Sequence, residues 1–182
     1  MTTTPRLLMT EEEFLAKYAD ELPSYEFVNG EVTQKPMTKR SHSALARRIS
    51  ARIDSHIERF GGAGGPEPTV NLSTPGSRRF RVPDVAYWTR AKDTGAAILG
   101  APTLSVEIIS EGQTHRELRE KCRHFQAAGT DVCWLVDPDR RTVEVFDDTH
   151  DGEVLAAPAV LESPHMPGFQ LALADLFSVL DA

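Results

Sequence analysis

The stretch Phe80-Arg-Val-Pro-Asp-Val-Ala-Tyr-Trp88 places a carboxylate inside a run of strand-forming residues. Side chains two positions apart in a strand point to the same face, so Asp84 would share a face with apolar neighbours. Those neighbours are Phe80, Val82, Ala86 and Trp88. An ionised carboxylate without a partner is costly to bury, so such an acid is normally paired, protonated or bound to a metal. The sequence therefore predicts a strand over residues 80–88 and chemistry at Asp84.

A second acid lies in Leu104-Ser-Val-Glu-Ile-Ile-Ser110. This stretch predicts a strand from Thr103 to Ile109, in which Glu107 faces away from the main apolar row. That row is Leu104, Val106 and Ile108, and Glu107 shares the other face with Ser105 and Ile109. The two predicted strands are joined by a connector over residues 90–102, so the carboxylates of Asp84 and Glu107 could converge at the edge of a sheet.

Two hard oxygen ligands together with a backbone carbonyl and waters suit Mg²⁺, which binds proteins through one or two carboxylates near a phosphate. The reaction that such a site implies is metal-assisted hydrolysis. The site also needs a positive group that orients the attacking water or stabilises the charge developing on phosphorus. Lys121, one helix after the second acid, is the best candidate.

The N-terminal part of the chain carries two short-range signals. Thr10-Glu-Glu-Glu13 has the form of a capping box and predicts a short helix over about 11–18. Asn29-Gly30 separates the strand formers of 25–28 from those of 31–34, a pattern that predicts a tight hairpin.

Helical periodicity then predicts two longer helices. The first runs over 41–60 and ends at Gly61-Gly62, and the second runs over about 114–128 and ends at Gly129. Their apolar stripes are Leu45, Ile49, Ile53, Ile57 and Phe60 in the first, and Leu118, Cys122 and Phe125 in the second.

Strands complete the pattern. We expect them over 69–72, over 132–136 as a central strand, over 142–146, weakly over 153–156 and over 169–173. A terminal helix is expected over about 174–179, in a tail that closes one edge of the fold. The order of elements is sheet, helix, sheet, which indicates an α/β (α+β) domain.

Composition bounds the class of protein. The chain has 182 residues, 40% hydrophobic and 26% charged, which fits one globular domain over 1–182. Its apolar runs are short and its first residues lack the apolar core of a signal peptide, so we expect a cytoplasmic protein with no membrane association. Cys122 and Cys133 are not spaced like the cysteine ligands of a metal ion and are predicted to be reduced thiols in the core.

The net charge of −7 argues against a protein that coats nucleic acid non-specifically, because such binding depends on neutralising phosphates. It leaves room for a local basic groove. Arginine and lysine gather at Arg47/Arg48/Arg52, at Arg78/Arg79/Arg81 and at Arg116/Arg119/Lys121/Arg123.

These residues together resemble a known group of enzymes. Pro83-Asp84 followed by the Glu107 strand is similar to the PD-(D/E)xK nuclease superfamily, and a wider set of motifs over nearly the whole chain resembles the Uma-two restriction endonuclease family. The set is Tyr25-Glu-Phe-Val-Asn-Gly-Glu31, His42, Val82-Pro-Asp84, Val106-Glu-Ile-Ile-Ser110, Lys121, Trp134-Leu-Val-Asp-Pro138 and Pro167-Gly-Phe169.

The resemblance implies a restriction-endonuclease-like fold, with a central mixed sheet flanked by helices and an N-terminal helix and hairpin. It implies a Mg²⁺-dependent endonuclease that hydrolyses DNA, with Mn²⁺ as a substitute. Asp84 and Glu107 would be metal ligands, completed by the carbonyl of Ile108. Ile109 stands where the superfamily has its lysine, and Lys121 matches a lysine that has moved to the next helix.

Two further positions match the family. Glu26 matches an acid that joins the site as an additional ligand or supports it from the outer layer, and His42 matches a position near the start of the long helix whose role is open. The chain departs from the family after Ser110, where Glu111-Gly-Gln113 replaces the usual proline and adds a negative charge beside the expected phosphate site. Enzymes that cut both strands are often symmetric dimers, so a homodimer is expected.

The site residues also have simpler interpretations, and Asp84, an acid after proline at a strand start, would be a turn or cap residue. Glu107 would be a solvated strand residue, and Lys121 would pair with Glu117 four residues earlier in a helix. Glu26 would pair with a basic residue across its hairpin, and His42 would be an ordinary residue at a helix start. At the level of function, two alternatives stand beside the nuclease. They are a non-catalytic module that binds a protein or a nucleic-acid end, and a metal-dependent hydrolase of a small phosphorylated substrate.

Overall fold

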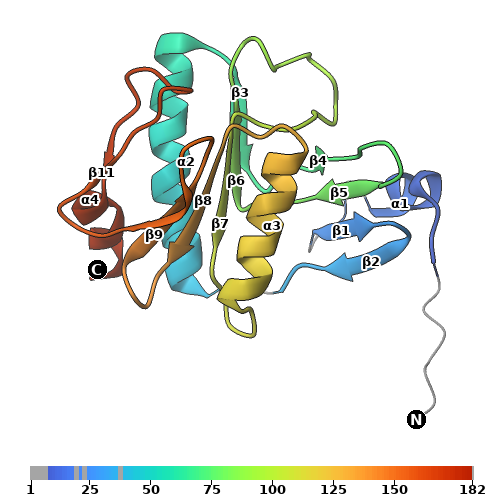
Figure 1. Ribbon diagram of the computed structural model, residues 1–182, viewed down its shortest axis with the longest axis horizontal. Coiled ribbons are helices and arrows are strands. Elements are labelled where there is room, and N and C mark those ends of the chain that lie inside the picture. The colour runs from blue at the N-terminus through green and yellow to red at the C-terminus, as the bar shows by residue number, and fades with distance from the viewer. Residues whose placement is uncertain (1–7, 19–20, 22–23, 37–38, 182) are drawn as a thin grey trace.

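The computed structural model describes residues 8–18, 21, 24–36 and 39–181. A six-stranded mixed sheet lies at its centre, in the order β10-β9-β8-β7-β6-β3, with β7 and β8 as a parallel pair (Figure 1). The strands are β3 (Ala63–Pro66), β6 (Val85–Trp88), β7 (Leu104–Ile108), β8 (Val132–Asp137), β9 (Thr142–Phe146) and β10 (Asp151–Leu155). The strands predicted over 103–109, 132–136, 142–146 and 153–156 are confirmed.

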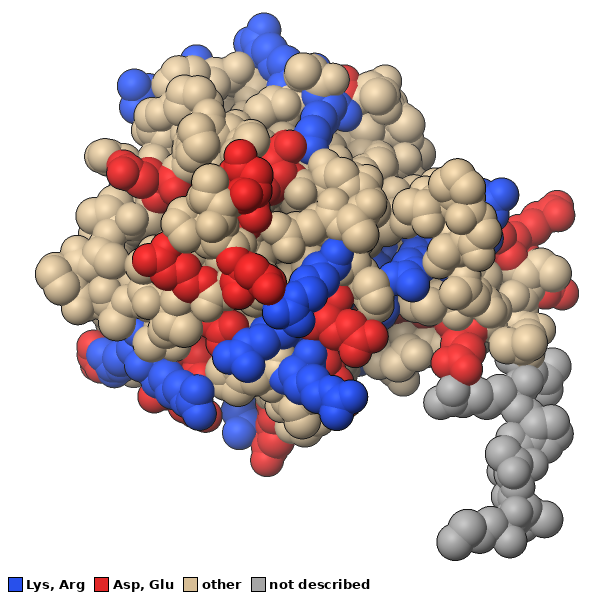
Figure 2. Space-filling view, in the orientation of Figure 1, with Lys and Arg blue, Asp and Glu red and all other residues tan. Residues whose placement is uncertain are grey.

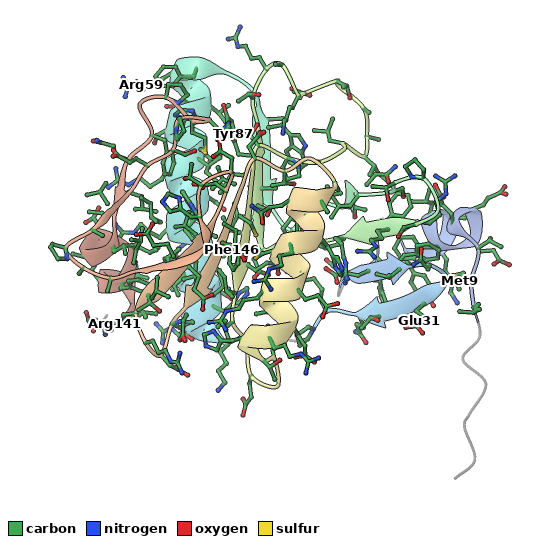
Figure 3. The ribbon with its side chains drawn as sticks, in the orientation of Figure 1. Met9, Glu31, Arg59, Tyr87, Arg141 and Phe146 are labelled. Carbon is green, nitrogen blue, oxygen red and sulfur yellow. The ribbon has the colours of Figure 1, made fainter. Side chains whose placement is uncertain are left out.

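Two helices cover opposite faces of this sheet. On one face, α2 (Arg40–Phe60) packs its buried Leu45, Ile49 and Ile53 against apolar residues of β6, β7, β8 and β9. On the other face, α3 (His115–Ala127) packs Leu118 and Cys122 against β8 and β9. Figure 3 shows Phe146 of β9 beside α3. Both predicted helices are confirmed, although Phe60 at the end of the first stripe is 43% exposed.

The predicted single strand over 80–88 is wrong. Residues 79–81 form β5 (Arg79–Arg81), which lies in a separate four-stranded sheet, whereas β6 begins only at Val85. Proline cannot donate to a strand ladder, so Pro83 lies in the break between the two sheets. β6 is buried on both faces, so alternation along one continuous strand does not account for the burial of Asp84.

The four-stranded sheet has the order β2-β1-β5-β4 and contains the predicted hairpin. β1 (Tyr25–Val28) and β2 (Glu31–Gln34) pair antiparallel through the turn at Asn29-Gly30. Both turn residues have positive φ, 49° and 97°, which the Asn-Gly dipeptide tolerates. β4 (Val70–Asn71) is a shortened form of the strand predicted over 69–72.

The first helix closes this small sheet. α1 (Glu11–Tyr18) begins at the predicted capping box, in which Thr10 and Glu13 exchange hydrogen bonds of 2.8–3.2 Å. Its buried Phe14 packs against Phe27 and Phe80, so the small sheet has an aromatic core of its own. The chain just before α1 reaches the hairpin turn, where Met9 N–H donates to Gly30 O at 2.9 Å, and Figure 3 shows Met9 and Glu31 at that end of the molecule.

The glycine-rich edge strand β3, which pairs with β6, is not among the strands predicted from the sequence. A Cβ atom on Gly64 would lie 2.7 Å from Ala86 O, and one on Gly62 would lie 2.2 Å from Trp88 O. The stretch has a low propensity to form a strand because it is rich in glycine, and glycine is needed here because two backbones approach closely.

The C-terminal tail covers a face of the main sheet, where sequence analysis expected it to close an edge. β11 (Val160–Leu161), β12 (Leu171–Ala172), α4 (Leu173–Phe177) and the 3₁₀ turn η1 (Ser178–Leu180) follow β10. Buried tail residues join the same core as α2, and Figure 1 shows the tail beside that helix. Those residues are Leu161, Met166, Phe169, Leu171, Leu173, Leu176 and Phe177.

Two further expectations concern the chain as a whole. Within the described part, no helix combines the length and apolar character that crossing a membrane requires. The first six residues, for which no signal peptide is predicted, lie outside the described residues. Cys122 and Cys133 are both free and buried, as predicted.

Candidate active site

The predicted acids meet where the two sheets join. Asp84 directly precedes β6, and its backbone N–H donates to Val106 O of β7 at 2.9 Å. Its side chain turns along β7, where Oδ2 accepts the N–H of Ile108 at 2.6 Å. Asp84 is thereby fixed to the residue after Glu107, and both acids are buried, with 3% and 2% exposure.

Lys121 reaches the same point from α3. Its Nζ lies 2.9 Å from each oxygen of Glu107, 2.6 Å from Glu26 Oε1 and 3.4 Å from Val82 O. The simpler interpretation, in which Lys121 pairs with Glu117, is wrong because Glu117 forms the capping box with Thr114. The predicted alternation, which put Glu107 on the face opposite Leu104, Val106 and Ile108, is confirmed, and in the structure Lys121 of α3 contacts it there. The burial of Glu107 excludes a solvated strand residue.

Glu26 of β1 supports the site from the small sheet. Its Oε1 accepts the N–H of Val82 at 3.0 Å in addition to the contact with Lys121, and its Oε2 accepts from Arg81 at 2.7 Å. Both earlier interpretations of Glu26 therefore hold in part, since it reaches the site and also pairs across strands. Its basic partner Arg81 lies on β5 and not within the hairpin.

His42 lies in the first turn of α2 and is 5% exposed. Its Nε2 is 3.0 Å from Asp84 Oδ2. His42 thus lies at a helix start, as expected, and the structure also brings it to Asp84.

Lys35 is a site residue that sequence analysis missed. It directly follows β2, and its Nζ lies 2.8 Å from Asp84 Oδ1 and 3.4 Å from Glu67 Oε1. No local pattern marks this contact, because it joins residues 49 positions apart. The tight hairpin was the one available signal, since it fixes where the chain leaves β2.

The acids of this site differ in pKa. Burial would raise the pKa of Asp84, but the hydrogen bond from His42 and the charge of Lys35 outweigh burial and hold the pKa well below its ordinary value. Burial raises the pKa of Glu107 to about 7, with Lys121 opposing this effect and the charge of Asp84 reinforcing it. Glu107 is therefore the acid that holds a proton most readily near neutral pH.

Glu26 and Lys121 stabilise each other as ions. Burial would raise the pKa of Glu26, but the charges of Lys121 and Arg81 lower it to about 2. Burial would likewise lower the pKa of Lys121, and the charges of Glu107 and Glu26 raise it instead. Lys121 is thus a permanent cation held among carboxylates.

Two hollows open beside the cluster. One, of about 560 Å³, lies between the hairpin and α3 and is lined by residues including Glu26, Lys35, Arg81 and Lys121. The other, of about 490 Å³, lies beside α2 and is lined by residues including His42, Glu67 and Asp84. Lys35 lines the first hollow, and its partner Asp84 lines the second. Figure 2 shows acidic and basic side chains interspersed on the face that carries α3, without a broad basic surface.

The carboxylates of the site can be tested for their fit to a divalent metal ion. Among the described residues, no three or more His, Cys, Asp or Glu side chains form a ready-made metal site, and the acids are paired with lysine and histidine. However, Glu107 Oε1 is buried and accepts no hydrogen bond of acceptable geometry, although Lys121 Nζ is 2.9 Å away. Two buried carboxylates with one unsatisfied oxygen fit Mg²⁺, which needs only one or two carboxylates from the protein.

Comparisons with known proteins agree on one group. The family model Uma2, described as "Putative restriction endonuclease", matches residues 11–174. The crystal structure of a "putative nuclease belonging to DUF820" from Anabaena variabilis ATCC 29413 is similar with a TM-score of 0.81 and 28% sequence identity, covering 94% of this chain and 99% of that chain. No curated protein matches the chain. The likeness to this structure over 94% of the chain confirms the predicted fold class.

Proposed function

The chain belongs to the Uma2 restriction endonuclease family, and we propose that it is a Mg²⁺-dependent nuclease that hydrolyses phosphodiester bonds of DNA. The observation that carries the metal site is the buried pair of Asp84 and Glu107, in which Glu107 Oε1 has the ion pair with Lys121 but accepts no hydrogen bond of acceptable geometry. An unsatisfied carboxylate oxygen is costly to bury unless a ligand or a proton completes it. A divalent cation at this oxygen supplies what is missing, and Mn²⁺ is the expected substitute.

In this proposal Asp84 and Glu107 hold the metal, and the backbone carbonyl of Ile108 completes the set of protein ligands. A metal ion in such a site lowers the pKa of a bound water and offsets charge that develops on phosphorus. Asp84 is suited to this task because the Ile108 N–H and His42 fix its orientation. Glu107 must release its proton before it can serve as a ligand.

Lys121 orients the attacking water and offsets negative charge in the transition state. Its contacts with Glu26 and Glu107 fix the ammonium in place, so little reorganisation is needed during the reaction. Glu26 is in this proposal a positioning residue, since it holds Lys121 and the backbone of Val82.

The substrate binds in the hollow between the hairpin and α3, where Lys35, Arg81 and Lys121 offer positive charge. The same hollow is lined by Glu111, Glu117 and Glu120, so a polyanion meets opposing charges at its rim. We therefore expect DNA affinity to depend strongly on the metal ion, which adds positive charge at the centre of the site. A homodimer would supply two such sites to a duplex, and light scattering at several concentrations tests for it.

The central experiment incubates the protein with plasmid DNA and with single-stranded, duplex and RNA oligonucleotides, in Mg²⁺, Mn²⁺ or chelator. The proposal expects cleavage of DNA that requires the metal and falls about 100-fold or more in Asp84→Asn and in Glu107→Gln. Asp148→Asn is the matched control, because Asp148 has an exposed carboxylate distant in sequence from both acids. Unchanged cleavage by Asp84→Asn, with circular dichroism showing the wild-type fold, would overturn the proposal.

A further inference from the structure

Lys35 occupies one of the two oxygens that Asp84 could offer to a metal. Its Nζ lies 2.8 Å from Oδ1, and the side chain is only 10% exposed. Oδ2 is engaged elsewhere, with the Ile108 N–H at 2.6 Å and His42 Nε2 at 3.0 Å. In this structure every oxygen of Asp84 therefore has a donor.

The donors of the two oxygens differ in how easily they move. The Ile108 N–H belongs to the backbone of a fully buried strand, and His42 belongs to the long helix α2. Lys35, in contrast, lies outside β2, and its ammonium ends a flexible four-carbon stem. Oδ1 can thus be released without disturbing the sheet or the helix.

A second carboxylate is available to receive the lysine. Glu67 Oε1 lies 3.4 Å from Lys35 Nζ, and the Glu67 side chain is 41% exposed. The backbone holds this residue in place, because Glu67 N–H donates to Asp84 O at 3.1 Å. A small movement of the ammonium away from Asp84 therefore leaves it paired.

We propose that Lys35 is a built-in counter-ion that holds Asp84 Oδ1 in the absence of metal and moves to Glu67 and the adjacent hollow when a divalent cation binds. The proposal rests on the metal site proposed above. It follows from charge, because two buried acids without a divalent cation need a positive partner, whereas a bound divalent cation repels a nearby ammonium. Glu67 lines the hollow beside α2, so the displaced ammonium moves toward that hollow.

The consequence is a competition that can be measured without cleavage. If Lys35 occupies Oδ1 in roughly nine molecules of ten, its removal should lower the apparent Kd for the cation about tenfold. Lys35→Met keeps an apolar stem of similar length, and the metal-induced rise in Tm should also be larger in this variant. Calorimetric titration with Mg²⁺ and Mn²⁺ gives the Kd, and thermal melts with and without metal give the rise in Tm.

Lys39→Met is the matched control. Lys39 is four residues further along the chain, its side chain is 63% exposed, and it pairs with Glu111 at 3.0 Å. The substitution Lys39→Met removes the same charge as Lys35→Met but affects no contact with Asp84. The Kd of this variant for the cation should therefore match that of the wild type. Equal tightening in both variants would mean that net charge alone acts, and the role of Lys35 would be overturned.

Asp84→Asn separates this proposal from the proposed function. Suppose that Asp84→Asn abolishes metal binding, while the wild type and Lys35→Met bind the metal with the same Kd. This result would overturn the role of Lys35 and leave the nuclease proposal standing. If neither the wild type nor Lys35→Met binds the metal, both proposals are overturned. If Lys35→Met fails to fold, wild-type protein with ¹³C-labelled lysine serves instead, with the Lys35 signal assigned by its loss in Lys35→Arg. That signal should move on saturation with Mg²⁺, and a stationary signal would overturn the role of Lys35.

Discussion

The ammonium of Lys121 lies 2.6 Å from Glu26 Oε1, and this contact joins helix α3 to the first strand of the small sheet. The same ammonium also contacts Glu107 on the main sheet at 2.9 Å. One buried cation therefore links three elements, and its removal leaves two acids facing each other.

This link predicts unequal effects of its two ends on stability. Lys121→Met should lower the free energy of unfolding by about 3 kcal/mol or more, since it strands buried carboxylates. Glu26→Gln should cost about 1–2 kcal/mol, because Lys121 keeps Glu107 as a partner. Urea unfolding of both variants and of the double variant should give a cost for the double variant below the sum of the single costs. Strictly additive costs would show that Glu26 and Lys121 do not interact in solution.

The pKa of Glu107 predicts a pH dependence of stability. Its value is about 7 in the folded protein against an ordinary value of 4.5, so the folded state binds more protons between these pH values. The contribution of Glu107 to the free energy of unfolding is thus fully present below about pH 4.5 and is lost as the pH rises through about 7. A shift of this size corresponds to about 3 kcal/mol.

Comparison with Glu107→Gln isolates this effect, since glutamine does not titrate. The wild type should lose about 3 kcal/mol relative to Glu107→Gln between pH 4.5 and pH 8, measured by urea unfolding in chelator. Glu111→Gln is the control, because its carboxylate is 78% exposed, and it should follow the wild-type profile. Parallel profiles for the wild type and Glu107→Gln would contradict the raised pKa.

The glycine-rich strand β3 gives a prediction about the fold. Gly64→Ala should destabilise the protein by about 1–3 kcal/mol, because the new Cβ would lie 2.7 Å from the backbone oxygen of Ala86. Gly100→Ala introduces the same atom where nothing lies within 4 Å, so its effect should stay within about 0.5 kcal/mol. Chemical denaturation measures both, and similar costs for the two variants would argue against the pairing of β3 with β6.

The cysteines give a prediction about reactivity. Cys122 and Cys133 are both fully buried, and burial raises the pKa of the Cys122 thiol well above its ordinary value. Because the thiolate is the reactive form, neither thiol should react with Ellman's reagent in native buffer, and both should react in denaturant. Rapid labelling of the native protein would mean that α3 separates from β8 in solution.

Features that depend on neighbours in sequence were predictable. The capping box at Thr10, the turn at Asn29-Gly30 and the orientation of Glu107 each rest on a few adjacent residues, and the structure has all three. Asp84, Glu107 and Lys121 were candidates from the residues themselves, and the resemblance to a nuclease family added Glu26 and His42, which no local pattern relates to the acids.

Features that depend on the meeting of distant elements were not predictable. A strand broken at Pro83 looks like a continuous strand until the two sheets are known, because both halves are rich in strand-forming residues. The contacts of Lys35 with Asp84 and of Arg81 with Glu26 join residues 49 and 55 positions apart. Charge complementarity across such separations leaves no periodic signal in one sequence.

The break at Pro83 has a consequence for how this protein would unfold on heating. Asp84 lies directly after the junction between the two sheets, Glu26 lies on the smaller sheet, and Glu107 lies on the larger one. The smaller sheet has its own aromatic core around Phe14, and a small unit of this kind can open locally at less cost than global unfolding. Gentle heating should therefore separate the two halves of the site while the main sheet stays folded, so that the proposed cleavage of DNA should end well before the melting of the protein.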